Sequence, residues 1–171
     1  LNFLTNNILT ASQLEGGGYI SAKEELDLSG LFRDCINDFK GRFPERIFIE
    51  QLADDADVKG DPLLLQMLVN NLLENAIKYS PKESPIKAML SEQDKYILLQ
   101  VVDEGMGIPD EEKKKIFQKF YRVGNESTRK TQGTGLGLYL CNIIARAHNA
   151  DISVTNNTLR GSNFAVKFYK S

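Results

Sequence analysis

The chain has 171 residues, of which 42% are hydrophobic, and its 23 acidic and 21 basic residues give a net charge of -2. This length supports one domain with a core of its own and is short for two. The basic residues are scattered along the sequence, so no positively charged surface for duplex nucleic acid is indicated, and nucleic-acid binding is disfavoured.

The two cysteines and the hydrophobic segments indicate a reduced protein outside the membrane. Cys35 and Cys141 lie far apart without a CxxC spacing, which is typical of reduced core residues in a cytosolic protein. No apolar run approaches the roughly 20 residues of a spanning helix, and no signal peptide opens the chain. We therefore expect no direct membrane contact. Because the sequence begins at Leu1 and not at Met, we expect a piece of a longer protein.

The first 15 residues predict a short amphipathic helix that ends at Gly16 to Gly18. This helix is too small to have its own core, so we interpret it as the end of an upstream helical element. Residues 23–28 alternate in polarity like an edge strand. Ser29 can then cap a helix that runs to about Phe43, before Pro44. The expected buried face of that helix contains Leu31, Phe32, Cys35, Ile36 and Phe39.

The middle of the chain predicts strands at 47–49 and 57–60, followed by a long helix. Asp61 and Pro62 form a strong helix start, because Asp can accept a bond from a free amide and proline tolerates the first helical position. This helix should end near Ser80, since Pro81 disfavours helix in the residue before it. Strands at 86–91 and 96–103 follow, and the second is apolar on both faces, as expected of a central strand.

The remaining segments complete an α+β pattern. Asp110 is expected to cap a short helix through Phe117, and residues 123–132 predict a polar loop. A helix over 136–148 and strands at 152–154 and 163–168 close the chain. Strands and helices do not alternate strictly. We therefore expect an α+β domain, a two-layer α/β sandwich with a mixed sheet and helices on one face.

A polar ridge on the long helix is the first candidate site. Asn71, Asn75 and Lys78 are spaced to share one face of a helix. A neighbouring apolar stripe would anchor the helix in the core. A ridge of two amides and one ammonium suits a metal-bound phosphate chain, because a neutral amide oxygen is a hard donor for Mg²⁺. The apolar stripe consists of Leu65, Leu68, Val69, Leu72 and Ala76.

Two glycine clusters are the other candidates. In 103–108, a carboxylate at the end of the central strand can accept a hydrogen bond from an exocyclic amine of a base, while glycines let the backbone approach a planar ring. A tight turn with a solvated Asp is the alternative. In 133–138, glycines precede a helix whose free amides can bind an anion. This cluster is not a dinucleotide fingerprint, because Leu138 replaces the last glycine, and no Gly-Lys-Ser/Thr follows as in a phosphate loop.

Taken together, the segments NNLLENAIKYS, DEGMGI, IFQKFYR and GTGLGL resemble, in character and order, the nucleotide-binding domain of sensor histidine kinases. That family shares the Bergerat ATP-binding fold with gyrase-type ATPases. The resemblance covers about Ile20 to Ser171, and ASQLEGG is similar to the end of a second dimerisation helix. It implies a dimerisation-helix remnant at 1–15, a linker at 16–19 and a catalytic ATP-binding domain at 20–171, with ATP and Mg²⁺ as cofactors.

The resemblance also implies roles for individual residues. Asn71, Asn75 and Lys78 would form the catalytic set, with Asn75 on the Mg²⁺ that bridges the phosphates. Tyr79 would pack by the adenine, although it could equally be a core aromatic with one wet end, and Asp103 would take the adenine amino group. The other implied nucleotide-binding residues are Gly105, Gly107 and Ile108 by the base, Phe117, Phe120 and Arg122 beside a lid at 123–132, and Gly133, Thr134, Gly135, Leu136, Gly137 and Leu138 at the helix start.

The sequence departs from the family pattern at two places. Leu159 stands where the last glycine box usually has a glycine two residues before Gly161. After His148, Asn149 and Ala150 replace the usual pair of glycines, although Asn can still adopt the left-handed conformation of a helix end. Neither change touches the proposed phosphate site.

His148 is the only histidine. The family's phosphoacceptor lies on the first dimerisation helix and is usually followed by an acidic residue, whereas Asn149 follows here. His148 is therefore expected to be structural, and the chain to bind Mg-ATP without phosphorylating itself on histidine. The implied partners are a histidine-containing dimerisation domain of the same parent and the receiver domain of a response regulator. The parent would be a homodimer, and this domain would be the cytoplasmic part of a membrane-bound sensor.

Two other functions compete with a kinase. An ATP-hydrolysing clamp of the same fold carries a general-base Glu one helical turn before the metal-binding Asn, a position that is Asn71 here. A non-catalytic binding module, such as a degenerate kinase domain or a serine-kinase anti-sigma factor, is the second alternative. The intact motifs argue against the degenerate domain, and the helix remnant argues against the anti-sigma factor.

Overall fold

The computed structural model describes residues 3–19, 22–124 and 135–170. Its main sheet has the strand order β2-β4-β5-β7-β6, with β2 and β4 parallel and the other pairs antiparallel. The strand predicted to be central, β5, is confirmed there. The strands are β2 (Phe48–Leu52), β4 (Ile86–Glu92), β5 (Tyr96–Val102), β6 (Ala150–Asn156) and β7 (Ser162–Tyr169).

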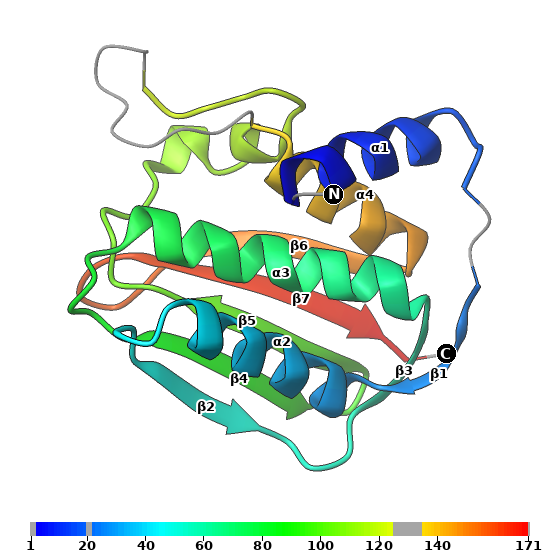
Figure 1. Cartoon of the computed structure of the whole chain (residues 1–171), viewed down its shortest axis with the longest axis horizontal. Helices are drawn as coiled ribbons and strands as arrows, with labels where there is room; N and C mark the ends of the chain where they lie inside the picture. Colours follow the sequence, from blue (N-terminus) through cyan, green and yellow to red (C-terminus); the bar gives the residue numbers. More distant parts are fainter. Residues whose placement is uncertain (1–2, 20–21, 125–134, 171) are drawn as a thin grey trace.

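The helices lie on one face of this sheet (Figure 1), which confirms the expected two-layer α+β sandwich. They are α2 (Leu28–Arg42), α3 (Pro62–Tyr79) and α4 (Gly137–Ala147), and the N-terminal helix α1 (Phe3–Glu15) lies beside α4. The edge strand expected at 23–28 is present at 24–27, outside the main sheet. It forms β1 (Glu24–Asp27), which pairs with β3 (Asp57–Gly60) in a separate two-stranded sheet. Four-residue strands carry no periodicity that could have assigned them to one sheet or the other.

The start of α3 follows directly from its sequence. Oδ1 of Asp61 accepts hydrogen bonds from the backbone N–H groups of Leu63 at 3.0 Å and Leu64 at 3.2 Å, as expected of a helix cap followed by proline. Ser80 at the other end has extended backbone, with ψ of 152°. The buried face of α3 holds Leu64, Leu65, Leu68, Val69, Asn71, Leu72, Leu73 and Ala76.

Two predicted helix starts are wrong. Asp27, and not Ser29, occupies the N-cap of α2, and the buried Ser29 hydroxyl donates instead to the carbonyl of Ala53 at 2.5 Å. Residues 110–117 form two 3-10 turns, Asp110–Glu112 and Lys115–Phe117, and not one helix capped by Asp110. Only Ile116 is buried in these two turns, so the segment has no apolar face that would stabilise a longer helix.

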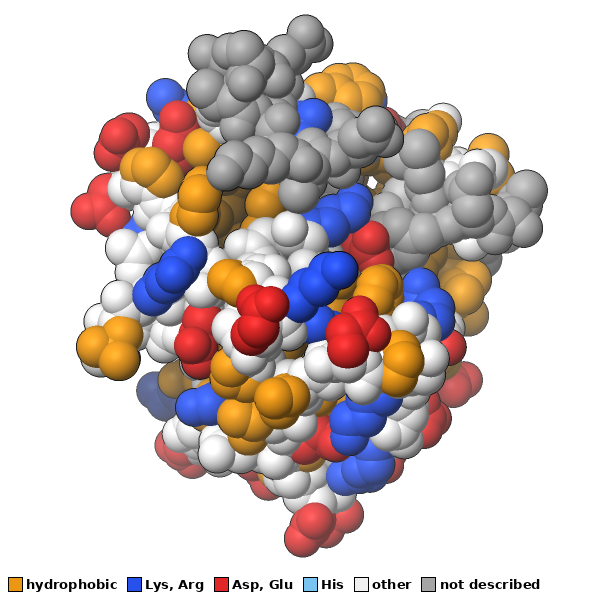
Figure 2. Space-filling model, turned by 60° about the vertical axis from the view of Figure 1, so that its left-hand side comes forward, with side chains coloured by type: hydrophobic (Ala, Val, Ile, Leu, Met, Phe, Trp, Pro, Cys, Tyr) orange, Lys and Arg blue, Asp and Glu red, His pale blue; other side chains and the backbone are white. Residues whose placement is uncertain are grey.

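Both cysteines are free and buried in the core, as predicted. Burial raises the pKa of the Cys35 thiol to about 12 and also raises the pKa of Cys141. Acidic and basic side chains are interspersed on the face shown in Figure 2. No helix within the described ranges combines the length and the hydropathy that crossing a bilayer requires.

His148 joins the end of α4 to the start of α3. Its Nε2 accepts from the backbone N–H of Asp61 at 3.0 Å, and its Nδ1 lies 2.8 Å from the carbonyl of Ile144. Because a backbone N–H can only donate, Nε2 must be unprotonated, so the ring is neutral with its proton on Nδ1. Burial lowers the pKa of His148. The prediction of a structural histidine agrees with these contacts.

This arrangement makes the folded state sensitive to mild acid. The folded pKa of His148 lies below the unfolded value of 6.5, so its contribution is complete above that pH and decreases as the pH falls below it. We expect the melting temperature to drop by a few degrees between pH 7.5 and pH 5.5. His148→Gln should show a smaller drop. The carboxyl of Asp61 has a pKa lowered from 3.8 and so titrates outside this window. An equal drop in both proteins would contradict the prediction.

Candidate functional site

Three motifs that are far apart in sequence meet at one end of the sandwich. They are the C-terminal half of α3, the segment after β5 and the start of α4. A Cβ atom on Gly105 would lie 2.0 Å from the carbonyl oxygen of Tyr79, and one on Gly137 would lie 2.7 Å from Oδ1 of Asn71. Glycine is therefore required at position 105, where the atom it would meet is backbone, whereas a side chain at position 137 would displace the Asn71 amide.

Asp103 is fixed at the end of β5. Its side chain is buried, and Oδ1 accepts from the backbone N–H groups of Gly105 at 2.8 Å and Ser162 at 3.4 Å. Within the described part of the chain, the other carboxylate oxygen accepts no hydrogen bond. Burial raises the pKa of Asp103, against the opposing effects of these two hydrogen bonds and of the Arg46 charge. One oxygen is thus held in place while the second can accept a bond from a ligand.

The loop between β6 and β7 packs against the backbone of Asp103 and Gly105. Gly161 has a φ of +102°, and a Cβ atom there would lie 1.9 Å from the carbonyl oxygen of Asp103. Arg160 donates from Nε to the carbonyl of Gly105 at 3.0 Å. Leu159, which departs from the family pattern, is 98% exposed. The close approach in this loop is therefore made at Gly161, and Leu159 does not contribute to it.

The three residues of the polar ridge on α3 differ in their exposure to solvent. Asn75 is half-buried, and Lys78 is exposed, with its Nζ 3.8 Å from a carboxylate oxygen of Glu74. Asn71, in contrast, is only 4% exposed. The two amides therefore have different surroundings, and those of Asn71 come from the N-terminal helix.

Asn71 forms a reciprocal pair with Asn7 of α1. Nδ2 of Asn7 donates to Oδ1 of Asn71 at 2.9 Å, and Nδ2 of Asn71 donates to Oδ1 of Asn7 at 3.2 Å and to the carbonyl of Met67 at 2.8 Å. Asn7 is not among the site residues predicted from the sequence. A signal was available, because Asn7 shares a helical stripe with Ala11 and Leu14, which pack in the core.

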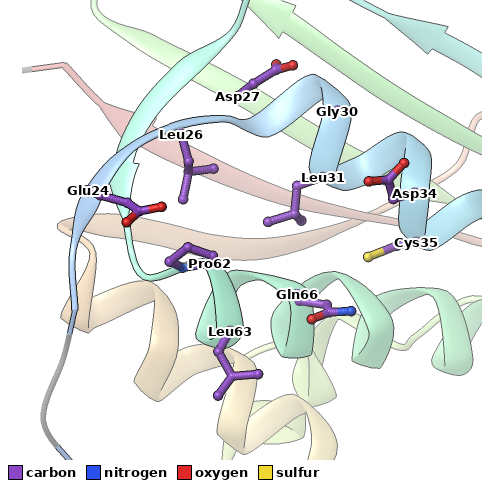
Figure 3. Close-up of a pocket in the computed structure, with 10 residues that line it drawn as sticks. All are labelled: Glu24, Leu26, Asp27, Gly30, Leu31, Asp34, Cys35, Pro62, Leu63 and Gln66. Atoms are coloured by element: carbon purple, nitrogen blue, oxygen red, sulfur yellow. The ribbon is translucent and has the colours of Figure 1, made fainter.

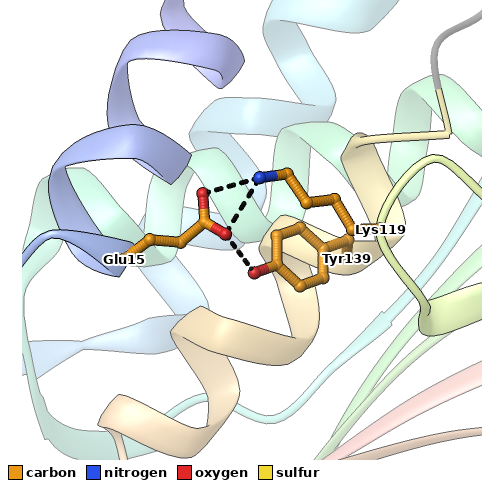
Figure 4. A network of polar contacts seen from close by, with 3 residues as sticks. All are labelled: Glu15, Lys119 and Tyr139. Atoms are coloured by element: carbon orange, nitrogen blue, oxygen red, sulfur yellow. Dashed lines mark hydrogen bonds and ion pairs between the residues drawn. The ribbon is translucent and has the colours of Figure 1, made fainter.

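The C-terminal end of α1 is held by a second polar contact (Figure 4). Nζ of Lys119 lies 3.1 and 3.0 Å from the two carboxylate oxygens of Glu15, and the Tyr139 hydroxyl donates to Glu15 at 2.7 Å. The Tyr139 hydrogen bond, followed by that of Lys119, lowers the pKa of Glu15. Helix α1 is thus attached to α3, to α4 and to the segment just before Phe120.

The Asn7 pair should make a measurable contribution to this attachment. Asn7→Ala removes two of the three hydrogen bonds of the buried Asn71 amide, which costs about 1–3 kcal/mol. The exposed Asn6 is a matched control, and Asn6→Ala should change stability by less than about 0.5 kcal/mol. Urea unfolding gives these energies, and hydrogen exchange should show faster exchange of α1 amides in Asn7→Ala only. Equal behaviour of the two variants would contradict the importance of the pair.

The residues on either side of the predicted lid contact each other. The backbone N–H of Phe120 donates to the carbonyl of Gly135 at 3.0 Å, and both residues have positive φ, 65° and 73°. Phe117 packs edge-on against Phe164, with ring centroids 6.3 Å apart, whereas Phe120 is 64% exposed.

The other predicted site residues differ in burial. Ile108 and Leu138 pack against the core, and Leu136 is buried. Arg122 is half-buried. The predicted site residues Gly133 and Thr134, and positions 125–132 of the lid with Arg129 and Lys130, lie outside the described residues.

A cavity of about 630 Å³ lies elsewhere, between β1, α2 and the start of α3 (Figure 3). It is bordered by the carboxylates of Glu24, Asp27 and Asp34 and by several leucines, and no predicted site residue lines it. A phosphate chain would be repelled by three carboxylates. The structure therefore separates this cavity from the candidate site.

Comparison with known proteins identifies relatives of the chain. Residues 60–171 match the family described as histidine kinase-, DNA gyrase B- and HSP90-like ATPase. The chain is 33% identical over 165 residues to the sensor histidine kinase YkoH of Bacillus subtilis. This match covers 96% of the chain but 36% of YkoH, so the chain spans little more than a third of that relative.

Solved structures give the same result for the fold. The catalytic domain of histidine kinase ThkA superimposes with a TM-score of 0.77 and 28% identity, covering 87% of this chain and 96% of that one. Full-length ShkA in complex with AMPPNP matches with a TM-score of 0.82 and 20% identity, covering 98% of this chain and 36% of ShkA. The expected fold class is thereby confirmed.

Proposed function

Because the chain belongs to the family of histidine kinase-, DNA gyrase B- and HSP90-like ATPases, we propose that it is the ATP-binding catalytic domain of a sensor histidine kinase. In this proposal it transfers the γ-phosphate of Mg-ATP to a histidine on a separate dimerisation domain. The observation that carries the proposal is the meeting of α3, the end of β5 and the start of α4, where Gly105 lies against Tyr79 and Gly137 lies against Asn71.

The residues present fit both ATP and Mg²⁺. Asp103 has an oxygen available to accept the adenine amine, and the amide oxygen of Asn75 is a hard donor suited to Mg²⁺. The first turn of an α-helix has backbone N–H groups without partners inside the helix, so the start of α4 suits phosphate. The exposed Lys78 forms a loose ion pair with Glu74, with Nζ 3.8 Å from the carboxylate oxygen, and its long side chain can turn to phosphate. A bound Mg²⁺ would neutralise part of the phosphate charge.

Phosphoryl transfer requires mainly positioning and charge neutralisation from a protein. Asp103 would hold the adenine base, and the start of α4 would hold the phosphates. Held at both ends, the nucleotide would present its γ-phosphate to an incoming imidazole. A phosphorus–nitrogen bond then forms as the bond to the bridging oxygen breaks, and ADP leaves. This chain would supply the binding site, and the nucleophile would come from the other domain.

The identity of residue 71 favours transfer over hydrolysis. A hydrolase of this fold needs a carboxylate one turn before the metal-binding Asn in order to accept a proton from water. Asn71 has no basic oxygen for this task, and its amide is already paired with Asn7. An ATP-hydrolysing clamp is therefore the weaker alternative.

The proposal extends to the parts of the parent protein. Helix α1 would be the end of a dimerisation helix, residues 16–19 the linker, and 20–171 the catalytic domain. The partners would be the histidine-containing dimerisation domain of a homodimeric parent and a response regulator receiver domain. The domain would lie in the cytoplasm, as part of a membrane-bound sensor.

Mixing the chain with a histidine-containing dimerisation domain and γ-labelled ATP distinguishes the three candidate functions. Acid-labile label on the dimerisation domain supports the kinase. Release of phosphate without labelled protein supports the hydrolase, and neither product supports a binding module. The chain incubated alone should acquire no phosphohistidine, because His148 is buried and bonded through both ring nitrogens.

A further inference from the structure

Arg46 is a buried cation that belongs to none of the sequence motifs. It lies in the turn between α2 and β2 and is only 7% exposed. Its Nη1 donates to the carbonyl of Ile77 at 3.2 Å, and its Nη2 donates to the hydroxyl of Ser80 at 2.7 Å. That hydroxyl donates in turn to the carbonyl of Ala76 at 2.6 Å. Arg46 therefore binds the C-terminal end of α3.

These contacts address a specific need of the helix. The last four carbonyls of an α-helix have no partner within the helix, and a positive charge near them is favourable. Arg46 meets this need directly at Ile77 and through Ser80 at Ala76. The orientation of the last turn of α3, which carries Lys78 and Tyr79, is fixed by a side chain from outside the helix.

The last turn of α3 is also the surface on which the segment after β5 rests. The Tyr79 carbonyl lies where a side chain on Gly105 would be, and the N–H of Gly105 donates to Asp103. A continuous series of contacts thus runs from Arg46 through α3 and Gly105 to the carboxylate of Asp103.

The charge of Arg46 also acts on Asp103. It lowers the pKa of the Asp103 carboxyl and so opposes the effect of burial. Burial lowers the pKa of Arg46, and the charges of Glu45, Glu83 and Asp103 oppose this effect. Three other charged residues belong to the segments around Asp103. Glu104 follows it in the chain, Arg160 donates to the carbonyl of Gly105, and Lys87 of β4 pairs with Val102.

We propose that Arg46 is a positioning residue for the adenine end of the nucleotide site, acting through the C-terminus of α3 and through its charge on Asp103. The proposal rests on the proposed function, because it requires Asp103 to accept the adenine amine. A purely structural Arg46 would stabilise the domain without influencing which base is preferred. A positioning role for Arg46 therefore predicts that its replacement changes the preference for adenine and the pH dependence of that preference. A structural role predicts no change in either.

The test compares ADP with inosine diphosphate, in which an oxygen replaces the exocyclic amine. An ionised Asp103 accepts from the amine and repels the oxygen, whereas a protonated Asp103 can donate to the oxygen. Calorimetry of the full chain with each Mg-nucleotide from pH 8 to pH 5 gives the affinity ratio. Because the two nucleotides carry the same diphosphate, titration of the phosphates cancels in this ratio.

As the pH is lowered, Arg46→Met should lose its preference for ADP at a higher pH than the unmodified chain does. In the acidic range its ratio of ADP affinity to inosine diphosphate affinity should be roughly tenfold lower. Arg46→Lys keeps the charge without the two-pronged guanidinium. It should weaken the binding of both nucleotides and retain the pH dependence of the ratio. Arg33→Met, at an exposed position on α2, is the matched control. It should change neither the affinity for the two nucleotides nor the pH dependence of their affinity ratio.

Three outcomes would overturn the proposal or its basis. If Arg46→Met weakens both nucleotides equally at every pH, Arg46 is structural only. If Arg46→Met does not fold, Arg46→Lys decides the matter, because loss of the ADP preference with the charge retained would exclude a role for the charge. If the unmodified chain binds no ADP, the proposed function fails, independently of Arg46.

Discussion

Asn75→Ala is expected to weaken Mg-ATP binding by roughly a hundredfold while the domain remains folded. Asn75 is half-buried on α3, one turn beyond the buried Asn71. In the proposed site its amide oxygen is the protein's bond to Mg²⁺, so the variant loses the metal's link to α3. The apolar residues of that helix are unchanged, which is why folding should persist.

The control for this variant is Gln66→Ala, an exposed residue near the start of the same helix. Calorimetric titration with ATP in Mg²⁺ and in EDTA should show that the benefit of Mg²⁺ is lost in Asn75→Ala and retained in Gln66→Ala. Thermal unfolding followed by circular dichroism should give similar melting temperatures for both. Normal Mg²⁺-dependent binding and phosphotransfer by Asn75→Ala would remove this residue from the site.

The second large effect is expected at Gly161. Alanine there would place its Cβ 1.9 Å from the carbonyl oxygen of Asp103, at a φ of +102° that other residues rarely adopt. The atom it meets is backbone at the end of the central strand, so relief requires the strand end or the loop to move. We expect Gly161→Ala to lower the free energy of unfolding by about 3 kcal/mol or more and to weaken ADP binding.

Gly41→Ala is the matched control, because a Cβ atom on Gly41 in α2 would have no neighbour within 4 Å. It should stabilise the domain by about 0.5–1 kcal/mol, since alanine is the better helix residue. Urea unfolding of both variants gives the two free energies. Comparable stability of Gly161→Ala and the unmodified chain would show that the loop can adjust and that its glycine is not required.

The sequence was most informative where structure is determined locally. Asp61 and Pro62 specify the start of α3, Pro81 its end, and the apolar pattern of 96–102 the central strand. The convergence of α3, β5 and α4 was expected only from the family resemblance, because no local pattern indicates which strand end lies beside which helix. The charged segment 110–117 was wrongly assigned, since a possible cap is not sufficient without a buried face.

Contacts between distant segments were missed for the same reason. Asn7 and Asn71 are 64 positions apart, and Arg46 binds a helix end more than 30 residues away. A buried polar side chain is recognisable only by the partner that satisfies it, and that partner is set by the packing of the helices. The sequence therefore predicted residues of a candidate site but not Asn7 or Arg46, which support them.

The central claim is that nucleotide binds where α3, the end of β5 and the start of α4 meet. An NMR titration of the isotope-labelled chain with Mg-ADP tests this claim most directly. We predict chemical-shift changes concentrated at 71–79, 103–108 and 135–138, with little change at Leu26, Leu31 and Gln66 around the separate cavity. Changes concentrated at that cavity and absent from Asn75, Asp103 and Gly137 would contradict the account.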